Sequence, residues 1–131
     1  MKYLLDTDTL IDFLQDRGET RQRITAMIEA GDEVAVSAIA VAELYSGLSE
    51  SKRTQWGEWI TSLPYWQISR EAAKHAGMDR KAASVAGKTL SVTDSLVAAV
   101  AREHQAAVLT SNIKHYPMKD VRVLSLREDA A

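Results

Sequence analysis

Nine residues near the N-terminus, Tyr3-Leu-Leu-Asp-Thr-Asp-Thr-Leu-Ile11, decide the fold of this chain. Tyr3 to Leu5 reads as a short buried strand, and a helix is expected from about Asp8, with Thr7 or Asp8 capping its first turn. A strand that passes directly into a helix is the first half of a βαβ unit. The junction also carries two acids, Asp6 and Asp8, and their presence at the end of a strand needs an explanation.

Short apolar strands alternate with helices along the rest of the chain. We expect helices over residues 19–30, 37–49, 52–62, 70–85 and from Ser91 onward, strands over 33–36, 107–109 and 121–124, and an extended connection over 65–68. Strands separated by helices indicate a parallel sheet covered on both faces. The predicted fold class is therefore α/β, a three-layer α/β/α sandwich, in a single domain over residues 1–131.

Composition excludes several classes of function. The chain has no cysteine, so disulfides, zinc-thiolate sites and thiol catalysis are excluded, and we expect a cytoplasmic protein that does not enter a membrane. The net charge of −2 carries no general signature of nucleic-acid binding. Any such binding must therefore depend on local groups of basic residues.

Two further acids lie in otherwise apolar helices. Glu43 is the only charged residue among Ala38 to Tyr45, a segment whose apolar residues on every side predict a buried helix. Asp94 completes the pattern Ser91-x-x-Asp94, a capping box, and for Asp94 alone the capping role is the preferred interpretation.

Considered together, these acids favour a metal site. Ligands of open parallel sheets bind outside the carboxyl ends of the strands, where Asp6 and Glu43 can converge and Asp94 can join them. Several carboxylates buried together require a cation or a proton, and oxygen ligands without cysteine suit magnesium or manganese. Asn112 follows another strand and offers a neutral oxygen, and Thr110 or Ser111 offers a hydroxyl, although a plain polar turn is the alternative for these residues.

Four blocks of sequence, in this order, resemble those of PIN-domain ribonucleases, and more narrowly the VapC toxins of toxin–antitoxin pairs. The blocks are Y-L-L-D-T-D-T-L-I (3–11), S-x-I-x-x-A-E-L-x-x-G (37–47), D-S-L-V-A-A-V-A (94–101) and L-T-S-N-I-K-H-Y (109–116). The resemblance covers nearly the whole chain. It implies a PIN-like sandwich with a sheet of four or five parallel strands.

The resemblance also implies an activity and a set of site residues. It implies an endoribonuclease that uses Mg²⁺ or Mn²⁺ held by Asp6, Glu43 and Asp94, and leaves 5′-phosphate and 3′-hydroxyl ends. Asn112 stands where PIN domains often carry a fourth acid, and His115 where many members carry an acid or a histidine. The residues that we expect to assist are Asp8, Thr7, Thr110 and His115, but helix capping is at least as good an explanation for Asp8.

Basic and aromatic residues suggest where partners bind. Charge clustering makes Lys88, Lys114, Arg80 and Lys81 the candidates for contacts with RNA phosphates. The family resemblance implies a toxin that inhibits translation and growth by cleaving RNA, with transfer RNA and ribosomal RNA as candidate substrates. It also implies a cognate VapB-like antitoxin that neutralises the toxin, a homodimer and a toxin–antitoxin hetero-oligomer. The aromatic group Trp56, Trp59, Tyr65 and Trp66 suits either the core or a groove for a protein partner.

Two other functions stay open at this level. A PIN fold with Asn112 in place of a ligand could bind antitoxin or RNA and cut weakly or not at all. A small phosphatase or a DNA nuclease could use the same acids, because metal-ligand chemistry alone does not select the substrate.

Overall fold

A five-stranded parallel sheet forms the centre of the protein, which we describe from a computed structural model over residues 1–127. The strands are β1 (Lys2–Leu5), β2 (Glu33–Ser37), β3 (Tyr65–Trp66), β4 (Ala107–Leu109) and β5 (Val123–Leu124), in the order β3-β2-β1-β4-β5. Every pair of neighbours is parallel. The sheet predicted from the alternating pattern is confirmed, with β1 at its centre.

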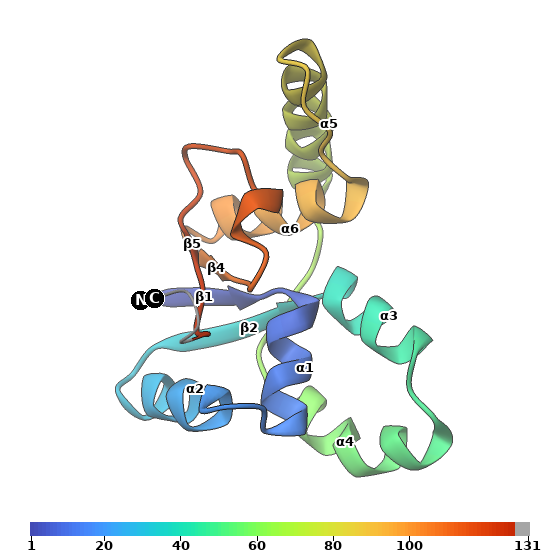
Figure 1. The fold of residues 1–131 in the computed structure, drawn as a ribbon, viewed down its shortest axis with the longest axis vertical. Helices are drawn as coiled ribbons and strands as arrows, with labels where there is room; N and C mark the ends of the chain where they lie inside the picture. The colour runs from blue at the N-terminus through green and yellow to red at the C-terminus, as the bar shows by residue number, and fades with distance from the viewer. Residues whose placement is uncertain (128–131) are drawn as a thin grey trace.

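Six helices cover the two faces of the sheet (Figure 1). They are α1 (Thr7–Gln15), α2 (Thr20–Glu29), α3 (Ala38–Ser46), α4 (Glu50–Ser62), α5 (Arg70–Val85) and α6 (Val92–Glu103), and a short 3₁₀ helix, η1, covers Ile113–His115. Figure 1 shows α1, α2 and α4 below the sheet, α3 beside the ends of β1 and β2, and α6 above the sheet, with α5 projecting beyond α6. The predicted three layers are confirmed.

Each face of the sheet has its own apolar core. On the side of α1 and α4, Leu5 and Val36 pack with Leu10, Ile24 and Ile60. A second core, on the side of α6, contains Leu4, Ala35, Val97, Val100 and Val108. Successive residues of a strand point to opposite faces, so Leu4 and Leu5 enter different cores. This is why the first strand reads as a continuous apolar run.

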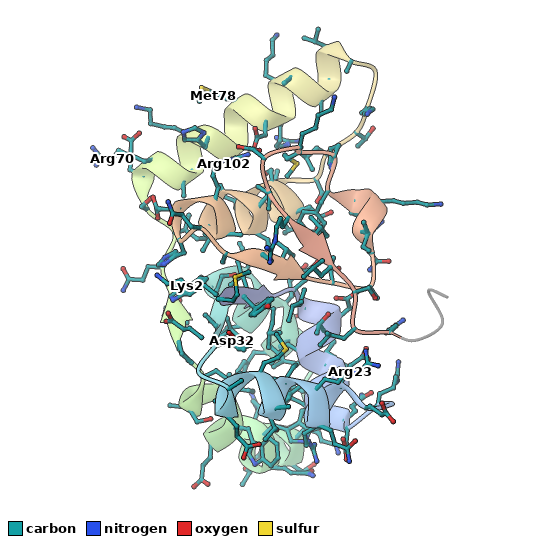
Figure 2. All side chains as sticks on the ribbon, turned by 90° about the vertical axis from the view of Figure 1, so that its left-hand side faces the viewer. Lys2, Arg23, Asp32, Arg70, Met78 and Arg102 are labelled. Carbon is teal, nitrogen blue, oxygen red and sulfur yellow. The ribbon has the colours of Figure 1, made fainter. Side chains whose placement is uncertain are left out.

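Helix α5 contacts the body through small residues. Ala72 and Ala76 pack against Ala99 of α6, and this contact forms a third, smaller core. Arg102 of α6 lies between these two helices (Figure 2) and pairs with Asp79 of α5 at 3.0 Å and with Asp120 at 2.7 Å. Because small side chains bury little area, this ion pair carries much of the attachment of α5.

Several predicted boundaries were wrong by a few residues. The segment predicted as an extended connection over 65–68 contains β3, and the last strand is shorter than predicted because only residues 123 and 124 pair with β4. Helix α3 ends at Ser46 rather than near Ser49, since Ser49 instead caps α4 by accepting from the backbone N–H of Lys52. Within residues 1–127, no helix has the length and apolar character needed to cross a membrane.

Candidate active site

Asp6 stands in the middle of the carboxyl edge of the sheet. Leu4 pairs with Ala35 of β2, and Leu5 pairs with Leu109 of β4, so the next step along the strands places Asp6 between Ser37 and Thr110. The backbone N–H of Asp6 donates to the carbonyl of Leu109 at 2.9 Å. The central strand therefore fixes the position of this acid, as expected for a residue at the carboxyl end of a parallel strand.

The carboxylate of Asp6 is 9% exposed and accepts two hydrogen bonds. The donors are the backbone N–H of Thr7 at 2.8 Å and the phenol of Tyr116 at 2.7 Å. Burial raises the pKa of Asp6 above its ordinary value, although these two hydrogen bonds act in the opposite direction. A nearby cation would relieve the cost of keeping this group charged.

Asp6 is also the N-cap of α1, a position that we expected Thr7 or Asp8 to occupy. That expectation was wrong because the helix begins one residue earlier than the pattern of apolar residues suggests. The strand ends at Leu5 and the helix starts at Thr7, which leaves Asp6 as the single residue between them. One carboxylate therefore closes the strand and caps the helix.

Thr7 connects this acid to Glu43. The hydroxyl of Thr7 donates to Oε1 of Glu43 at 2.5 Å, and this contact joins the start of α1 to α3. Glu43 is exposed, and α3 buries only Ala40 and Leu44, so the prediction of a helix buried on every side was wrong. The reason is that α3 packs on the rest of the chain through one face, which leaves Glu43 open to a ligand.

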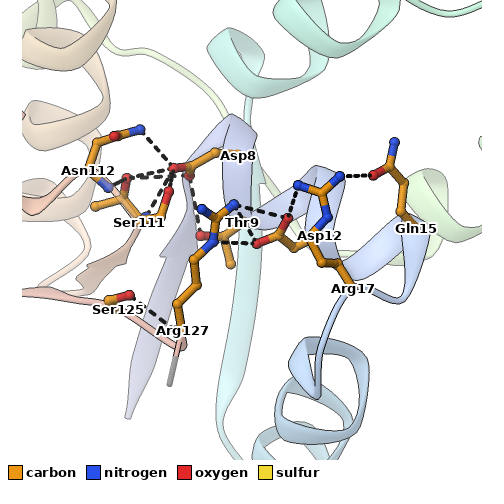
Figure 3. A network of polar contacts seen from close by, with 10 residues as sticks. Asp8, Thr9, Asp12, Gln15, Arg17, Ser111, Asn112, Ser125 and Arg127 are labelled. Atoms are coloured by element: carbon orange, nitrogen blue, oxygen red, sulfur yellow. Dashed lines mark hydrogen bonds and ion pairs between the residues drawn. The ribbon is translucent and has the colours of Figure 1, made fainter. Parts of the chain in front are cut away.

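Asp8 does not cap the helix but binds the loop after β4 (Figure 3). Its Oδ2 accepts from the backbone N–H of Ser111 at 3.0 Å and from Nδ2 of Asn112 at 2.9 Å, and the hydroxyl of Ser111 also donates to it. The hydroxyl of Thr110 adds a weaker contact at 3.3 Å. Asp8 therefore orders a loop that lies more than one hundred residues away in sequence.

Asp94 lies in the first turn of α6, as the capping pattern predicted. Its backbone N–H donates to the hydroxyl of Ser91 at 3.1 Å, so its side chain is available for another role. One carboxylate oxygen of Asp94 lies 3.6 Å from Nδ1 of His115. Asp94 and His115 thus face each other across the edge of the sheet.

Tyr116 contacts Asp6 and was not identified as a site residue from the sequence. It is buried, its phenol donates to Asp6, and burial together with the charges of Asp6, Asp94 and Asp8 raises its pKa well above the ordinary value. A phenol in these surroundings keeps its proton at any physiological pH and acts only as a donor towards Asp6. The sequence signal was its place as the last residue of the 109–116 block.

One buried acid near this site has a structural role instead. Asp12, one turn after Asp8, is 4% exposed, and its carboxylate accepts from Arg127 at 3.1 Å, with Arg17 at 3.7 Å (Figure 3). This pairing neutralises Asp12 and attaches the segment that follows β5 to α1. Asp12 is therefore not a candidate ligand.

The donor atoms at this edge have the chemistry that a magnesium or manganese ion requires. They are the carboxylates of Asp6, Glu43 and Asp94 with the amide of Asn112, all oxygen donors, and the buried Asp6 favours a neighbouring cation. As placed, however, Glu43 contacts Thr7 and Asp94 faces His115, and no group of three His, Asp or Glu side chains within residues 1–127 is close enough to hold an ion. These residues therefore fit the ion in the chemistry of their donor atoms and in their position at the carboxyl edge of the sheet.

The predicted RNA-binding residues fall into two groups. Lys114 of η1 lines a hollow of about 370 Å³ beside the acids, together with Asn112 and His115. Arg80, Lys81 and Lys88 line a different hollow, between α5 and the loop that follows it. The structure therefore brings one of the four basic residues to the acidic edge and the other three together elsewhere.

Comparison with known proteins finds relatives that are similar in sequence over nearly the whole chain. The chain is 25% identical to Ribonuclease VapC19 of Mycobacterium tuberculosis over 115 residues, which cover 88% of this chain and 92% of that protein. It is 25% identical to Ribonuclease VapC2 of Haemophilus influenzae over 134 residues, which cover 98% of this chain and 97% of that protein. Nearly the full length of each protein is therefore matched.

Solved structures share the fold. The crystal structure of VapBC2 from Rickettsia felis, bound to a DNA fragment from its promoter, matches with a TM-score of 0.84 at 20% identity, covering 97% of this chain and all of that one. The DNA-bound VapBC from Salmonella typhimurium matches with a TM-score of 0.82 at 23% identity over 95% and 98% of the two chains. The family model of the PIN domain matches residues 3–121. The chain therefore belongs to the PIN-domain family.

Proposed function

We propose that this chain is a metal-dependent endoribonuclease, a toxin of the VapC type that a cognate antitoxin neutralises. The observation that carries the proposal is that Asp6, Glu43 and Asp94 lie along the carboxyl edge of one parallel sheet, Asp6 directly after β1, Glu43 in α3 and Asp94 in the first turn of α6. Membership of the PIN family and similarity to proteins named Ribonuclease VapC support the nuclease activity. VapBC complexes among the structures with the same fold support the antitoxin.

Asp6, Glu43 and Asp94 would hold a Mg²⁺ or Mn²⁺ ion in this proposal. Such an ion, when bound, lowers the pKa of water and offsets the charge of a phosphodiester. Glu43 would have to leave Thr7, and Asp94 would have to turn from His115, since each now makes its closest polar contact there. Asp6 needs no such change, because its backbone and its side chain are already held at the edge.

The surrounding residues orient the acids and the substrate. Tyr116 keeps its proton and holds Asp6 in place, while Asp8 fixes Asn112 through the amide nitrogen and leaves the amide oxygen as an acceptor. Lys114 brings a positive charge to the hollow beside the acids, where it can attract a phosphate. His115 is exposed beside Asp94 and can hold a proton during cleavage.

Substitution of the three acids tests the proposal. Asp6→Asn, Glu43→Gln and Asp94→Asn should each lower the rate of RNA cleavage by at least about 100-fold, because each removes one charge of the ligand set. EDTA should stop cleavage by the unmodified protein, and added Mg²⁺ or Mn²⁺ should restore it. Asp16→Asn, an exposed acid at the other end of α1, is the matched control and should cut normally. Full activity in EDTA, or in any two of the three variants, would contradict the proposal.

A second candidate is a PIN-fold module that binds antitoxin or RNA without cutting. The observation that favours it is the present placement of Glu43 and Asp94, whose contacts are with Thr7 and His115. Calorimetric titration with Mn²⁺ separates the two functions. Heat of binding at millimolar metal that is lost in Asp6→Asn supports the enzyme, and no binding at that concentration supports the module.

The substrate and partners follow from the same proposal. Transfer RNA and ribosomal RNA are the candidate substrates, and their cleavage would inhibit translation and growth. Sequencing the 5′ ends of cellular RNA after induction of the protein identifies the target. A homodimer and a toxin–antitoxin hetero-oligomer are the assemblies that we expect, and light scattering of the protein alone and with its antitoxin measures both.

A further inference from the structure

A cationic hollow lies between α5 and the loop that joins it to α6. Its volume is about 390 Å³, and it is lined by Gly77, Arg80, Lys81, Ser84, Lys88, Thr89 and Leu90. Three of these residues are cations, two are hydroxyl donors and none is an acid. We call this hollow the α5 pocket.

One face of α5 builds the first wall of the pocket. Gly77, Arg80, Lys81 and Ser84 are spaced by three and four residues, so they lie on the same side of the helix. Gly77 has no side chain, and a Cβ placed there would meet nothing within 4 Å, so the upper part of this wall is open. Arg80 and Lys81 are exposed beside this open part of the wall.

The end of α5 turns the chain back to make the second wall. Gly87 has a φ of +76°, and the backbone N–H groups of Gly87 and Lys88 donate to the carbonyls of Ser84 and Ala83 at 3.0 and 2.8 Å. This pair of bonds is a Schellman turn, which reverses the chain at a helix end and here returns Lys88 to the side of the pocket. The local backbone thus fixes where this lysine starts.

Arg80 is held in position by the returning chain. Its Nε donates to the carbonyl of Leu90 at 3.0 Å, and Leu90 is itself buried. This bond uses one edge of the guanidinium and leaves the terminal amino groups for another acceptor. A guanidinium fixed in this way presents a planar pair of donors, which matches the oxygens of a phosphate.

The cations of the α5 pocket lack the carboxylate partners that several other cations of residues 1–127 have. Arg102, Arg17, Arg21 and Lys74 each lie within ion-pair distance of a carboxylate. Across residues 1–127, no carboxylate lies within that distance of Arg80, Lys81 or Lys88. The last turn of α5 holds no basic residue, so these cations are not placed to stabilise the helix dipole. Three neighbouring positive charges repel one another, and a bound anion removes that cost.

The pocket lies on the side of the molecule where the acidic edge is. The loop that lines it continues directly into Ser91, the N-cap of α6, and then to Asp94 in the first turn. Figure 1 shows this loop descending along α5 to the start of α6, on the right-hand side of the view, where the tip of β1 also lies. A strand of RNA that has one phosphate at the acids can therefore continue towards α5.

We propose that the α5 pocket binds a backbone phosphate of the RNA substrate, away from the bond that is cut. This inference rests on the proposed function for the identity of the substrate. RNA suits the pocket better than an acidic protein segment does, because a fixed guanidinium, two amines and two hydroxyls complement a phosphate. In the proposed function, RNA is also the ligand that binds at the acidic edge, from which its backbone can extend to the pocket.

RNA binding in EDTA tests the proposal without requiring cleavage. A fluorescein-labelled single-stranded RNA of mixed sequence is titrated with the unmodified protein and with Lys81→Gln, Lys88→Gln and the double variant, and binding is followed by anisotropy. Each single variant should bind about 3- to 10-fold more weakly, and the slope of log K against log salt should fall by about 0.7 for each lost contact. Both lysines are exposed, so the variants should melt like the unmodified protein.

Lys74→Gln is the matched control, since it removes the same charge from the same helix at a lysine paired with Glu71. The proposal is overturned if the pocket variants bind RNA like the unmodified protein, or lose no more affinity than Lys74→Gln does. It is also overturned if the same variants leave RNA binding intact and weaken only the antitoxin complex.

The result separates this proposal from the proposed function. Pocket-dependent binding by a protein that cuts no RNA supports the pocket and contradicts the nuclease. Normal cleavage with an unchanged KM in the pocket variants supports the nuclease and contradicts the pocket. Where both hold, KM rises in the variants while kcat stays the same.

Discussion

Asp6 caps a helix and, at the same time, keeps a carboxylate in a buried place. The cap stabilises the start of α1, whereas burial raises the pKa of the carboxyl group and makes its charged form costly. A protein selected only for stability would replace this acid by a neutral capping residue. Its presence is therefore best explained by function, as with other acids held in unfavourable surroundings.

The stability of Asp6→Asn measures this cost. The folded protein binds the proton of Asp6 more tightly than the unfolded chain, whose carboxyl has its ordinary pKa of 3.8, so the charged form destabilises the fold above the raised pKa. Asparagine also caps helices well. In EDTA at neutral pH, Asp6→Asn should melt at a higher temperature than the unmodified protein, and the gain should disappear as the pH falls below the ordinary value.

Thermal melts from neutral to acid pH, followed by circular dichroism, make this comparison. Asp16→Asn serves as the control, because Asp16 is exposed and pairs with Arg21 at the end of α1, and it should show no such gain. A lower melting temperature for Asp6→Asn at neutral pH would contradict the account of Asp6 given above.

Asp8 shows where sequence reasoning about single residues reaches its limit. Position and residue type identified Asp6, Glu43, Asp94 and Asn112 as side chains of one edge, because strand ends and helix starts are local properties. The role of Asp8 depends on Ser111 and Asn112, and the role of Tyr116 depends on Asp6. Such contacts join residues more than one hundred positions apart, and no local pattern encodes them.

At the scale of elements, the packing of α5 against α6 includes an ion pair made by one arginine, Arg102. The side chain of Arg102 is 19% exposed, it bonds Asp79 and Asp120, and its remaining Nη1 is buried without a partner among the residues that the structure describes. The hydrogen bond from Arg102 lowers the pKa of Asp120. The buried residues of the contact between the two helices are alanines, with Ile68 and Leu96 packed at its edge, so the contact buries little apolar area beside the ion pair.

Arg102→Ala should lower the free energy of unfolding by about 2 kcal/mol, since it leaves two acids facing each other without their cation. Urea unfolding at neutral pH measures the change. Lys74→Ala, which breaks an exposed pair on α5, should cost less than about 0.5 kcal/mol. An equal decrease in the free energy of unfolding in the two variants would show that the partly buried ion pairs of Arg102 stabilise the fold no more than an exposed pair does.

The order of elements was predictable, and their ends were less so. A run such as Glu33 to Val36 must be a strand between two helices, because its apolar residues have no helical spacing. The two-residue strand β3 could not be read in this way, since only its pairing with Val36 and Ser37 distinguishes it from a loop. Short edge strands are defined by their neighbours rather than by their own residues.

At the scale of the whole molecule, the face made by α1, α2 and α4 exposes an aromatic residue. Trp59 is 42% exposed, its ring lies 5.5 Å from that of Phe13, and the guanidinium of Arg21 lies 4.5 Å above it. Its neighbours Trp56 and Trp66 are buried, so the aromatic group divides between the core and the surface. An exposed tryptophan with a cation beside it is typical of a protein interface.

If the chain is the toxin proposed above, Trp59→Ala should abolish or strongly weaken its complex with the antitoxin, while the fold is retained. Copurification from cells that make both proteins measures the complex, and circular dichroism measures the fold. Met78→Ala is the control, because Met78 is 58% exposed on α5, on the opposite side of the sheet from this face (Figure 2). A complex that survives Trp59→Ala with its affinity unchanged would place the antitoxin elsewhere.

The single domain over residues 1–131 stays a prediction, which one cooperative unfolding transition would support.

The pairing of β1 with β4 has a consequence for the way the protein is made. Asp6 and Asp8 leave the ribosome more than one hundred residues before Thr110, Ser111, Asn112 and Tyr116, which hold them. Until β4 is synthesised, the central strand lacks one of its two neighbours and the acidic edge is incomplete. A nascent chain that stops short of β4 therefore lacks the complete acidic edge, and any activity that depends on these contacts requires β4 to have been made.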